Sequence, residues 1–241
     1  SVNANLVVGF GGYVAGPTVL GARLAGCKTA IHEANSIPGR TNRILGSMMD
    51  LTATHFDSTL SHLGGKRKLA LGMPLRRMAD VGDAAAARQR LGLQPDQWTL
   101  LIMGGSQGAK HLYEVILSKL EEIDASLSGP IQVLWSTGQN NYEALSEVTA
   151  RLNLQKIKLH MVPFISDMSS ALAAADMALA RAGASALAEL TTFRVYTVYV
   201  PFPGAIYDHQ TLNAREAEKH GLGVVLPENR VAAELDRKSV V

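Results

Sequence analysis

The sequence contains a single cysteine, Cys27, in 241 residues, so it has no internal disulfide and no metal site built from several cysteines. It also has little excess charge, because 23 Lys and Arg residues against 21 Asp and Glu residues give a net charge of +2. Nucleic-acid binding needs a basic stripe, which this balance does not provide. No apolar run approaches the roughly 20 residues that span a bilayer, and no basic start followed by an apolar core indicates a signal peptide. We therefore expect a cytoplasmic protein without a nucleic-acid partner.

Metal-ligand spacing is also missing. Most of the histidines are scattered along the chain, and none of them forms a cage pattern with its neighbours: His55, His62, His111, His160 and His220. We expect no bound metal and no cofactor.

What the sequence has in quantity is short apolar runs that alternate with helix-period segments. This alternation predicts an α/β protein with mostly parallel sheets. Residues 69–77, with a Gly and a Pro, and the polar, Ala-rich residues 80–94 interrupt it, so we expect a domain boundary near residues 74–95. The cluster of Lys66, Arg67 and Lys68 before it is expected to be a solvated loop. Strands are predicted at residues 6–8, 29–32, 51–54, 98–103, 131–135, 158–161, 177–180, 196–200 and 223–226.

Two glycine-containing turns of the second half follow predicted strands, at the edge where open parallel sheets bind ligands. Residues 104–108 (Gly-Gly-Ser-Gln-Gly) expose backbone N–H groups at a helix start, which favours an anion such as a diphosphate. An ordinary tight turn is the alternative. Residues 181–185 open a further helix, where Glu189 either accepts ribose hydroxyls or is a solvated helix residue.

A third polar segment, residues 208–213, follows the predicted strand at 196–200. Asp208 or Thr211 is expected to cap the helix that starts here. A cap explains one residue and leaves Gln210, whose amide offers both a donor and an acceptor to sugar hydroxyls.

The first half contributes a glycine-rich turn at residues 9–17 and a polar loop at residues 32–39. If the sheet is parallel, both face the same crevice. His32 and Glu33 are candidates for an acid/base or orienting pair, since neighbours on a loop can both turn to a ligand. The alternative for His32 is a half-buried histidine with satisfied hydrogen bonds.

Together these motifs resemble the MurG family, peripheral membrane N-acetylglucosaminyltransferases that convert lipid I to lipid II in bacterial peptidoglycan synthesis. The matching segments follow the family's order and approximate spacing over nearly the whole chain: residues 8–17, 32–35 with 41–42, 104–109, 163–165, 181–184 with Glu189, and 208–210.

The resemblance implies two Rossmann-like domains of the GT-B glycosyltransferase type, the first one incomplete. Residues 1–75 would be the remainder of the acceptor-side domain, 76–96 the linker region and 97–241 the UDP-sugar-binding domain. It further implies inverting transfer from UDP-N-acetylglucosamine to the muramyl 4-hydroxyl of a lipid-linked muramyl-peptide acceptor, lipid I, on the inner face of the plasma membrane. The donor is then a substrate, and no cofactor is implied.

Site residues follow from the same resemblance. Ile165 would meet the uracil, Ser106 and the helix start at Ala184 and Ser185 the diphosphate, Glu189 the ribose, and Gln210 the sugar. The catalytic candidates in this chain are His32 and Glu33, and the acceptor side is expected to include Gly11, Gly12, Tyr13 and Asn42. The full set of predicted donor contacts is Asn35, Arg76, Ser106, Gln107, Gly108, Phe164, Ile165, Arg181, Gly183, Ala184, Ser185, Ala186, Leu187, Ala188, Glu189 and Gln210.

The sequence also departs from the family. The family's opening glycine loop, with a histidine often proposed as the base, would precede residue 6, and its closing helix would follow residue 241. We therefore expect the chain to bind donor without transferring it unaided. Tyr113 stands where asparagine is usual, and residues 193–196 (Phe-Arg-Val-Tyr) lack the usual glycine helix stop, so we expect an irregular local fold there. A non-catalytic UDP-sugar-binding module and a UDP-N-acetylglucosamine epimerase of similar fold are the alternatives.

Overall fold

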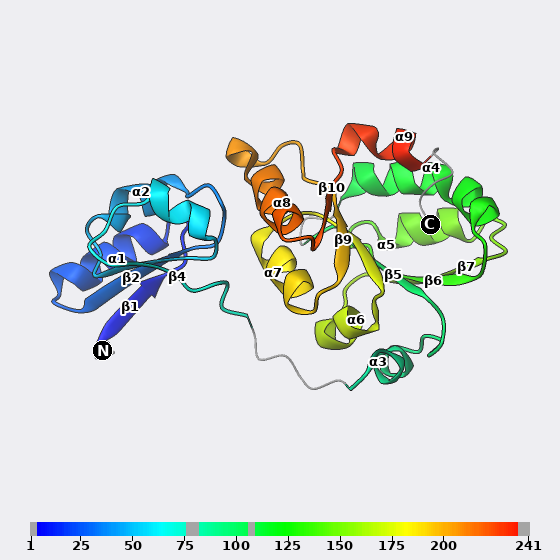
Figure 1. The fold of residues 1–241 in the computed structure, drawn as a ribbon, viewed down its shortest axis with the longest axis horizontal. Coiled ribbons are helices and arrows are strands. Elements are labelled where there is room, and N and C mark those ends of the chain that lie inside the picture. The colour runs from blue at the N-terminus through cyan, green and yellow to red at the C-terminus, as the bar shows by residue number, and fades with distance from the viewer. Residues whose placement is uncertain (1–3, 76–81, 106–108, 236–241) are drawn as a thin grey trace.

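The computed structural model describes residues 4–75, 82–105 and 109–235. Four of the predicted donor contacts lie outside these ranges: Arg76, Ser106, Gln107 and Gly108. The described residues form two parallel β-sheets with helices packed on them, so the predicted α/β class is confirmed. Figure 1 shows the smaller first half, coloured blue to cyan, beside the larger second half, coloured green to red.

The first half is a four-stranded parallel sheet in the order β1-β2-β3-β4. Three of these strands are where the sequence predicts them. The fourth is not, because Lys68 begins a strand instead of lying in a solvated loop. The elements are β1 (Leu6–Gly9), α1 (Ala15–Leu24), β2 (Lys28–Glu33), α2 (Arg40–Gly46), β3 (Leu51–Thr54), the 3₁₀ helix η1 (Asp57–His62) and β4 (Lys68–Ala70).

Helices α1 and α2 cover one face of this first sheet. Ile31 of β2 is buried there against Val19 of α1 and Leu45 of α2. Because side chains alternate between the faces of a strand, Val8 of β1 lies on the opposite face, where it stays exposed. The helical face carries the core of the first half.

The second half is a six-stranded parallel sheet in the order β10-β9-β8-β5-β6-β7. All six predicted strands are found, within about one residue at each end. The strands are β5 (Thr99–Met103), β6 (Ile131–Ser136), β7 (Ile157–Val162), β8 (Met177–Ala180), β9 (Tyr196–Tyr199) and β10 (Gly223–Val225). The helices are α3 (Ala84–Arg90), α4 (Lys110–Ser126), α5 (Tyr142–Thr149), α6 (Met168–Ala174), α7 (Ala184–Thr192), α8 (His209–Lys219) and α9 (Val231–Leu235), with the 3₁₀ helices η2 (Ile206–Asp208) and η3 (Glu228–Arg230).

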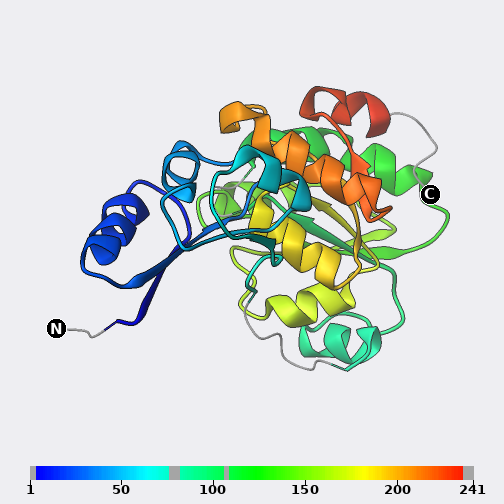
Figure 2. The ribbon, with the colours of Figure 1, turned by 60° about the vertical axis from the view of Figure 1, so that its left-hand side comes forward.

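Helices cover both faces of the second sheet. Leu101 and Met103 of β5 are buried in one core with α3, α6, α7 and α8, while Ile102 between them is buried in a second core with α4, α5 and α9. Helices α7 and α8 pack on each other and lie on the flank of the second half that is nearest the first half (Figures 1 and 2). No helix within the described ranges combines the length and the apolar character needed to cross a membrane.

Helix α3 lies inside the predicted linker but packs on the second half. Ala87 is buried in the core with α6. Arg88 is also buried, and its guanidinium donates to the carbonyls of Ala174 at 3.0 Å and Pro95 at 2.9 Å and pairs with Asp176 at 2.6 Å. These bonds fasten α3 to the second sheet, while the exact domain boundary stays a prediction.

The end of α7 is regular, which contradicts the irregular fold expected from its missing glycine. Arg194 takes the left-handed conformation with φ 55°, the conformation that glycine usually supplies at a helix end. Its N–H donates to the carbonyl of Thr191 at 3.1 Å, and Val195 N donates to the carbonyl of Leu190 at 3.0 Å. This pair of bonds is the Schellman motif, so the helix stops and β9 follows without a glycine.

Candidate functional site

The turn after β5 begins with Gly104 and Gly105, and Tyr113 on α4 explains the first of them. A Cβ atom on Gly104 would lie 2.1 Å from the Tyr113 hydroxyl oxygen, while Gly105 has φ +78°. The Tyr113 side chain is fully buried; its hydroxyl donates to the carbonyl of Ser136 at 2.9 Å, and its ring meets Trp135 edge-on. Burial raises the pKa of Tyr113 to about 12. Tyr113, which stands where the resembled family usually has asparagine, therefore leaves no room for a side chain at Gly104. Residues 106–108 of the turn lie outside the described residues.

The N-terminus of α7 offers unbonded N–H groups. Gly183 precedes the helix in an extended conformation, and no side chain caps it. Leu187 N makes the first backbone bond of the helix, to the carbonyl of Gly183 at 2.9 Å. The N–H groups of Ala184, Ser185 and Ala186 therefore have no acceptor among the described residues. With the helix dipole, they form a favourable position for an anion.

Side chains around this N-terminus divide between surface and core. Ser185 is exposed, and Glu189, four residues later, lies on the same side of the helix and is half-buried. Leu187 and Ala188 are instead buried in the core, so their side chains face away from any ligand at the helix end. Of the predicted contacts on α7, the geometry therefore favours backbone groups, Ser185 and Glu189.

Arg181, directly after β8, is a buried cation with protein partners. Its Nη1 pairs with the buried carboxylate of Glu228 in η3 and donates to the carbonyls of Val200 and Pro201, at 3.2 Å each. The guanidinium also lies over the ring of Phe202, 5.6 Å from its centroid. All the hydrogen bonds and the ion pair of this side chain use Nη1, so Nε and Nη2 have no hydrogen-bond acceptor in the described part of the chain. Arg181 thus holds the ends of two strands together, and its predicted donor contact would use the other nitrogens.

Gln210 lies in the first turn of α8, and one of the two polar atoms of its side chain is hydrogen-bonded within the protein. Its Oε1 accepts a hydrogen bond from Phe202 N at 3.0 Å, which ties α8 to the segment after β9. Its Nε2 has no acceptor among residues 4–75, 82–105 and 109–235. The amide nitrogen is therefore the part of Gln210 that can donate to a sugar hydroxyl.

The predicted side-chain cap of α8 is wrong. Asp208 precedes the helix, but it has φ 53° and accepts from the Thr211 hydroxyl at 2.6 Å rather than from a backbone N–H. Tyr207 before it also has φ 55°. Two consecutive non-glycine residues in the left-handed region store strain, a feature common near functional sites.

Phe164 and Ile165, which follow β7, differ sharply in exposure. Phe164 is 75% exposed, whereas Ile165 is 5% exposed and is packed in the core with α6 and β5. A uracil at this position could meet the backbone of Ile165 but not most of its side chain. A contact between the uracil and the backbone of Ile165 therefore stays a prediction.

Glu33 organises the loop after β2. One carboxylate oxygen accepts from Asn35 N at 3.0 Å and Asn35 Nδ2 at 3.4 Å, and the other accepts from Gly39 N at 3.0 Å and Asn42 Nδ2 at 2.8 Å. Asn42 is buried and also donates to the carbonyl of His32. Four donors occupy the acceptor positions of this carboxylate, so its geometry fits a positioning function rather than proton transfer.

His32 and Glu33 are not neighbours on a loop, which corrects the premise of an acid/base pair. Both belong to β2, so their side chains point to opposite faces. His32 Nε2 lies 2.8 Å from the carbonyl oxygen of Gly72, and Nδ1 is buried without a partner in the described ranges. The centroid of the Phe10 ring lies 5.5 Å from that of the His32 ring. The pKa of the nearby His55 is lowered, first by burial and second by the charge of His32. A catalytic function of His32 or Glu33 stays a prediction for each residue separately.

The predicted acceptor-side glycines form a turn beside Asn42, in which Gly11 is half-buried and Gly12 is exposed. Gly11 and Gly12 have φ +84° and +79°, which strongly favours glycine at both positions. A Cβ on Gly11 would lie 3.5 Å from Asn42 Nδ2. Tyr13 beside them is 91% exposed. The structure therefore places all four predicted residues close together, at the carboxyl ends of β1 and β2.

Sequence reasoning did not single out Asn213, although it joins the two halves. Its side chain is completely buried. Its Oδ1 accepts from Ser36 N at 2.8 Å, and its Nδ2 donates to Asn35 Oδ1 and to the carbonyl of Ala182, each at 3.2 Å. The one available signal was its spacing, since a residue three positions after Gln210 lies on the same side of a helix.

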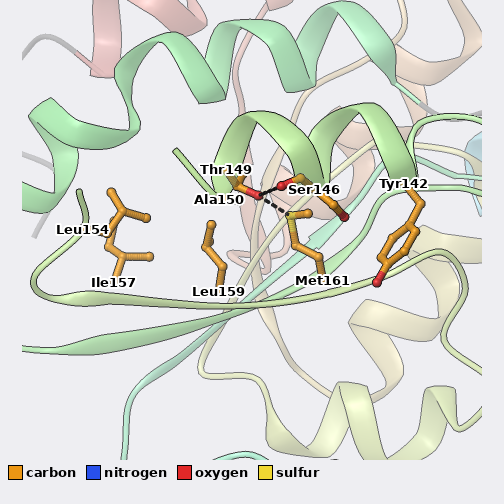
Figure 3. Close-up of a pocket in the computed structure, with 8 residues that line it drawn as sticks. All are labelled: Tyr142, Ser146, Thr149, Ala150, Leu154, Ile157, Leu159 and Met161. Carbon is orange, nitrogen blue, oxygen red and sulfur yellow. Dashed lines mark hydrogen bonds between the residues drawn. The ribbon is translucent and has the colours of Figure 1, made fainter. Parts of the chain in front are cut away.

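A surface groove of about 350 Å³ lies elsewhere, between α5 and the edge strand β7 (Figure 3). Thr149 Oγ1 lies within it and donates to the carbonyl of Ser146 at 3.2 Å. The groove contains none of the predicted donor contacts, so it is separate from the turns described above. Its lining residues are Tyr142, Ser146, Thr149, Ala150, Leu154, Ile157, Leu159 and Met161.

Comparisons with known proteins match both halves. The model of the glycosyltransferase family 28 C-terminal domain matches residues 99–239, and that of the N-terminal domain matches residues 1–54. The UDP-N-acetylglucosamine–N-acetylmuramyl-(pentapeptide) pyrophosphoryl-undecaprenol N-acetylglucosamine transferase of Desulfitobacterium hafniense strain Y51 is 37% identical over 235 residues, 95% of this chain and 63% of that protein. The protein of the same name from Syntrophus aciditrophicus is 38% identical over 224 residues, 93% of this chain and 60% of that protein. The chain thus spans about 60% of the length of these relatives.

Solved structures agree with this match. The crystal structure of Acinetobacter baumannii MurG has a TM-score of 0.74 and 31% identity, over 97% of this chain and 63% of that one. The UDP-GlcNAc 2-epimerase of Methanocaldococcus jannaschii has a TM-score of 0.61 at 15% identity, over 98% of this chain and 68% of that one, and therefore shows a shared fold alone. The expected GT-B arrangement is confirmed.

Proposed function

We propose, because the chain belongs to the MurG family within glycosyltransferase family 28, that its second half binds UDP-N-acetylglucosamine as the donor of a glycosyl transfer. The observation that carries the proposal is the unbonded N-terminus of α7 beside two further strand-end segments. Strands β5, β8 and β9 are neighbours in the sheet, so the turn at Gly105, the start of α7 and the Gln210 amide follow adjacent strands. Their chemistry fits a diphosphate that is flanked by hydroxyl-bearing sugars.

The acceptor is, by the same proposal, the 4-hydroxyl of a lipid-linked muramyl peptide, which gives lipid II. That oxygen attacks the anomeric carbon of the donor sugar, the bond from this carbon to the diphosphate oxygen breaks, and UDP leaves with the electron pair while a base takes the hydroxyl proton. The N–H groups and dipole of α7 stabilise the negative charge that develops on the departing diphosphate. Configuration at the anomeric carbon inverts.

The donor positions are proposed as follows. The diphosphate lies on the N–H groups of Ala184 to Ala186, Glu189 accepts the ribose hydroxyls, and the Gln210 amide nitrogen donates to the sugar. The half-buried position of Glu189 one turn beyond the anion position supports a ribose at that distance from the helix end. The backbone beside Phe164 then meets the uracil.

Calorimetric titration of the folded chain with UDP-N-acetylglucosamine and with UDP tests this proposal. We expect saturable heat for both ligands and weaker heat for a sugar nucleotide that carries another base. No heat at millimolar ligand, from a sample whose circular dichroism shows a folded α/β protein, overturns it. NMR of the ligand after incubation separates transfer from epimerisation, because a 2-epimer of the donor supports an epimerase instead.

Attachment to the inner face of the bacterial plasma membrane belongs to the same proposal, because the acceptor carries a lipid. Co-sedimentation with anionic vesicles that contain a polyprenyl diphosphate sugar tests it. We expect the chain to pellet with these vesicles and to stay in solution with neutral vesicles that lack the lipid-linked sugar.

A further inference from the structure

Asn213 occupies the point where three polar segments meet. Its carboxamide is completely buried, and each of its polar atoms is engaged: Oδ1 by Ser36 N, and Nδ2 by Asn35 Oδ1 and the Ala182 carbonyl. Two of these partners belong to the loop after β2 in the first half. The third belongs to the turn that leads into α7 in the second half. One side chain therefore connects a loop of each half to α8.

The segments that Asn213 connects are those that carry the proposed donor contacts. Asn35 is a predicted donor contact, and its own N–H and Nδ2 are held by Glu33. Ala182 immediately precedes Gly183, the residue before the unbonded N-terminus of α7. Gln210 lies three residues before Asn213, on the same side of α8.

We propose that Asn213 is a positioning residue that fixes the Asn35 loop against α8 and the start of α7, and thereby sets the affinity for the sugar end of the donor. This inference rests on the proposed function. Asn35 is hydrogen-bonded to the first turns of α8, where Gln210 meets the sugar in that proposal. The sugar, rather than the uridine, is therefore the part of the donor that lies nearest this connection.

Other contacts between the halves are poor candidates for this function because they are exposed. Ser58 Oγ donates to Glu216 Oε1 at 3.1 Å, and Arg40 Nε donates to the Tyr207 hydroxyl at 2.8 Å, both at the surface. Water can replace such bonds at little cost, whereas loss of a buried partner leaves the remaining groups unsatisfied. Asn213→Ala would leave an N–H and two oxygens without their partner.

Amide hydrogen exchange tests the connection without any ligand. In the 241-residue chain, Asn213→Ala should speed exchange at Ser36 by about tenfold, because Ser36 N then loses its acceptor. Ser58→Ala is the matched control, since it removes an exposed bond between the halves and should leave Ser36 unchanged. Unaltered exchange at Ser36 in a folded Asn213→Ala variant overturns the connection.

Donor titrations test the positioning. We expect Asn213→Ala to weaken UDP-N-acetylglucosamine binding about tenfold and UDP binding less than twofold, a split that general loosening of the fold would not produce. Asn35→Ala should have a similar effect, and the double variant should add little to either, because both changes remove the same contact. Equal losses for both ligands, or fully additive effects, overturn the positioning function.

Two further arms keep the outcomes distinct. If Asn213→Ala does not fold, Asn213→Asp replaces it. The new carboxylate still accepts from Ser36 N but cannot donate to Asn35 or Ala182. Slow exchange at Ser36 together with an unchanged affinity for UDP-N-acetylglucosamine then overturns the proposal. If the unaltered chain gives no heat with donor, the proposed function fails, and donor positioning by Asn213 fails with it. Exchange at Ser36 still decides whether the connection between the halves exists.

Discussion

Ser185→Glu separates anion binding from helix stability, because one negative charge has opposite effects on the two. Ser185 is exposed in the first turn of α7. A carboxylate there stabilises the helix by about 0.3–1 kcal/mol through the dipole. A diphosphate on the same N–H groups would lie on the order of 6 Å from it, and at an effective dielectric of about 20 two unit charges at that distance repel by about 3 kcal/mol. We expect roughly hundredfold weaker donor binding and a higher free energy of unfolding.

Titration calorimetry at two salt concentrations and urea unfolding measure these two effects. Raising the salt should reduce the loss of affinity, since ions screen the repulsion. Ser118→Glu, on the exposed side of α4 and away from any strand end, is the control and should leave affinity unchanged. Donor binding within threefold of the unaltered chain, in a Ser185→Glu variant with raised stability, would refute the placement of the diphosphate at α7.

Three further outcomes concern stability, each measured by urea unfolding. Gly104→Ala should destabilise the chain by about 1–3 kcal/mol, because the added Cβ overlaps the Tyr113 hydroxyl; Tyr113→Phe in the same chain should recover part of the loss. Arg194→Gly should stabilise it by about 0.5–1 kcal/mol, because glycine takes φ 55° without strain; no gain would contradict the strain. Burial raises the pKa of Tyr113 and Tyr199 to about 12, so between about pH 10 and 12 mainly the unfolded chain ionises at these positions. The free energy of unfolding should therefore fall over this range by up to about 3 kcal/mol per tyrosine, and by less in Tyr113→Phe.

The central strands of the second sheet, such as β5 and β6, could be predicted from sequence because they are buried on both faces. β5 is a continuous apolar run bounded by a glycine turn, and such a run has few other interpretations. β4 escaped prediction for the opposite reason. Its three residues begin at a lysine and are all exposed, so no hydrophobic pattern marks them.

The site was predictable where it consists of backbone and much less so where it depends on side-chain partners. Glycines after strands and the start of α7 are local features that spacing can show. The partner of Arg181 is Glu228, far along the chain, and the partner of Asn213 is a loop in the other half. Such pairs depend on how two sheets are placed, which periodicity within one segment does not encode. His32 and Glu33 show the related error, since a strand end was taken for a loop.

Three buried polar side chains of the candidate site bond to other groups of the protein and hold its backbone in place. Glu33 uses both carboxylate oxygens on the loop after β2, Arg181 holds the ends of β8 and β9, and Asn213 joins that loop to the start of α7. Removing any of these side chains leaves its buried hydrogen-bond partners unsatisfied. We therefore expect the backbone N–H groups that it positions to lose their order as well. In the proposed function, discrimination among sugar nucleotides then depends on the less buried groups, Glu189 and the Gln210 amide nitrogen. In the same proposal, the affinity for the diphosphate depends on the α7 backbone. No substitution of a surface side chain removes these N–H groups, so an opposing charge is the direct way to test the proposal.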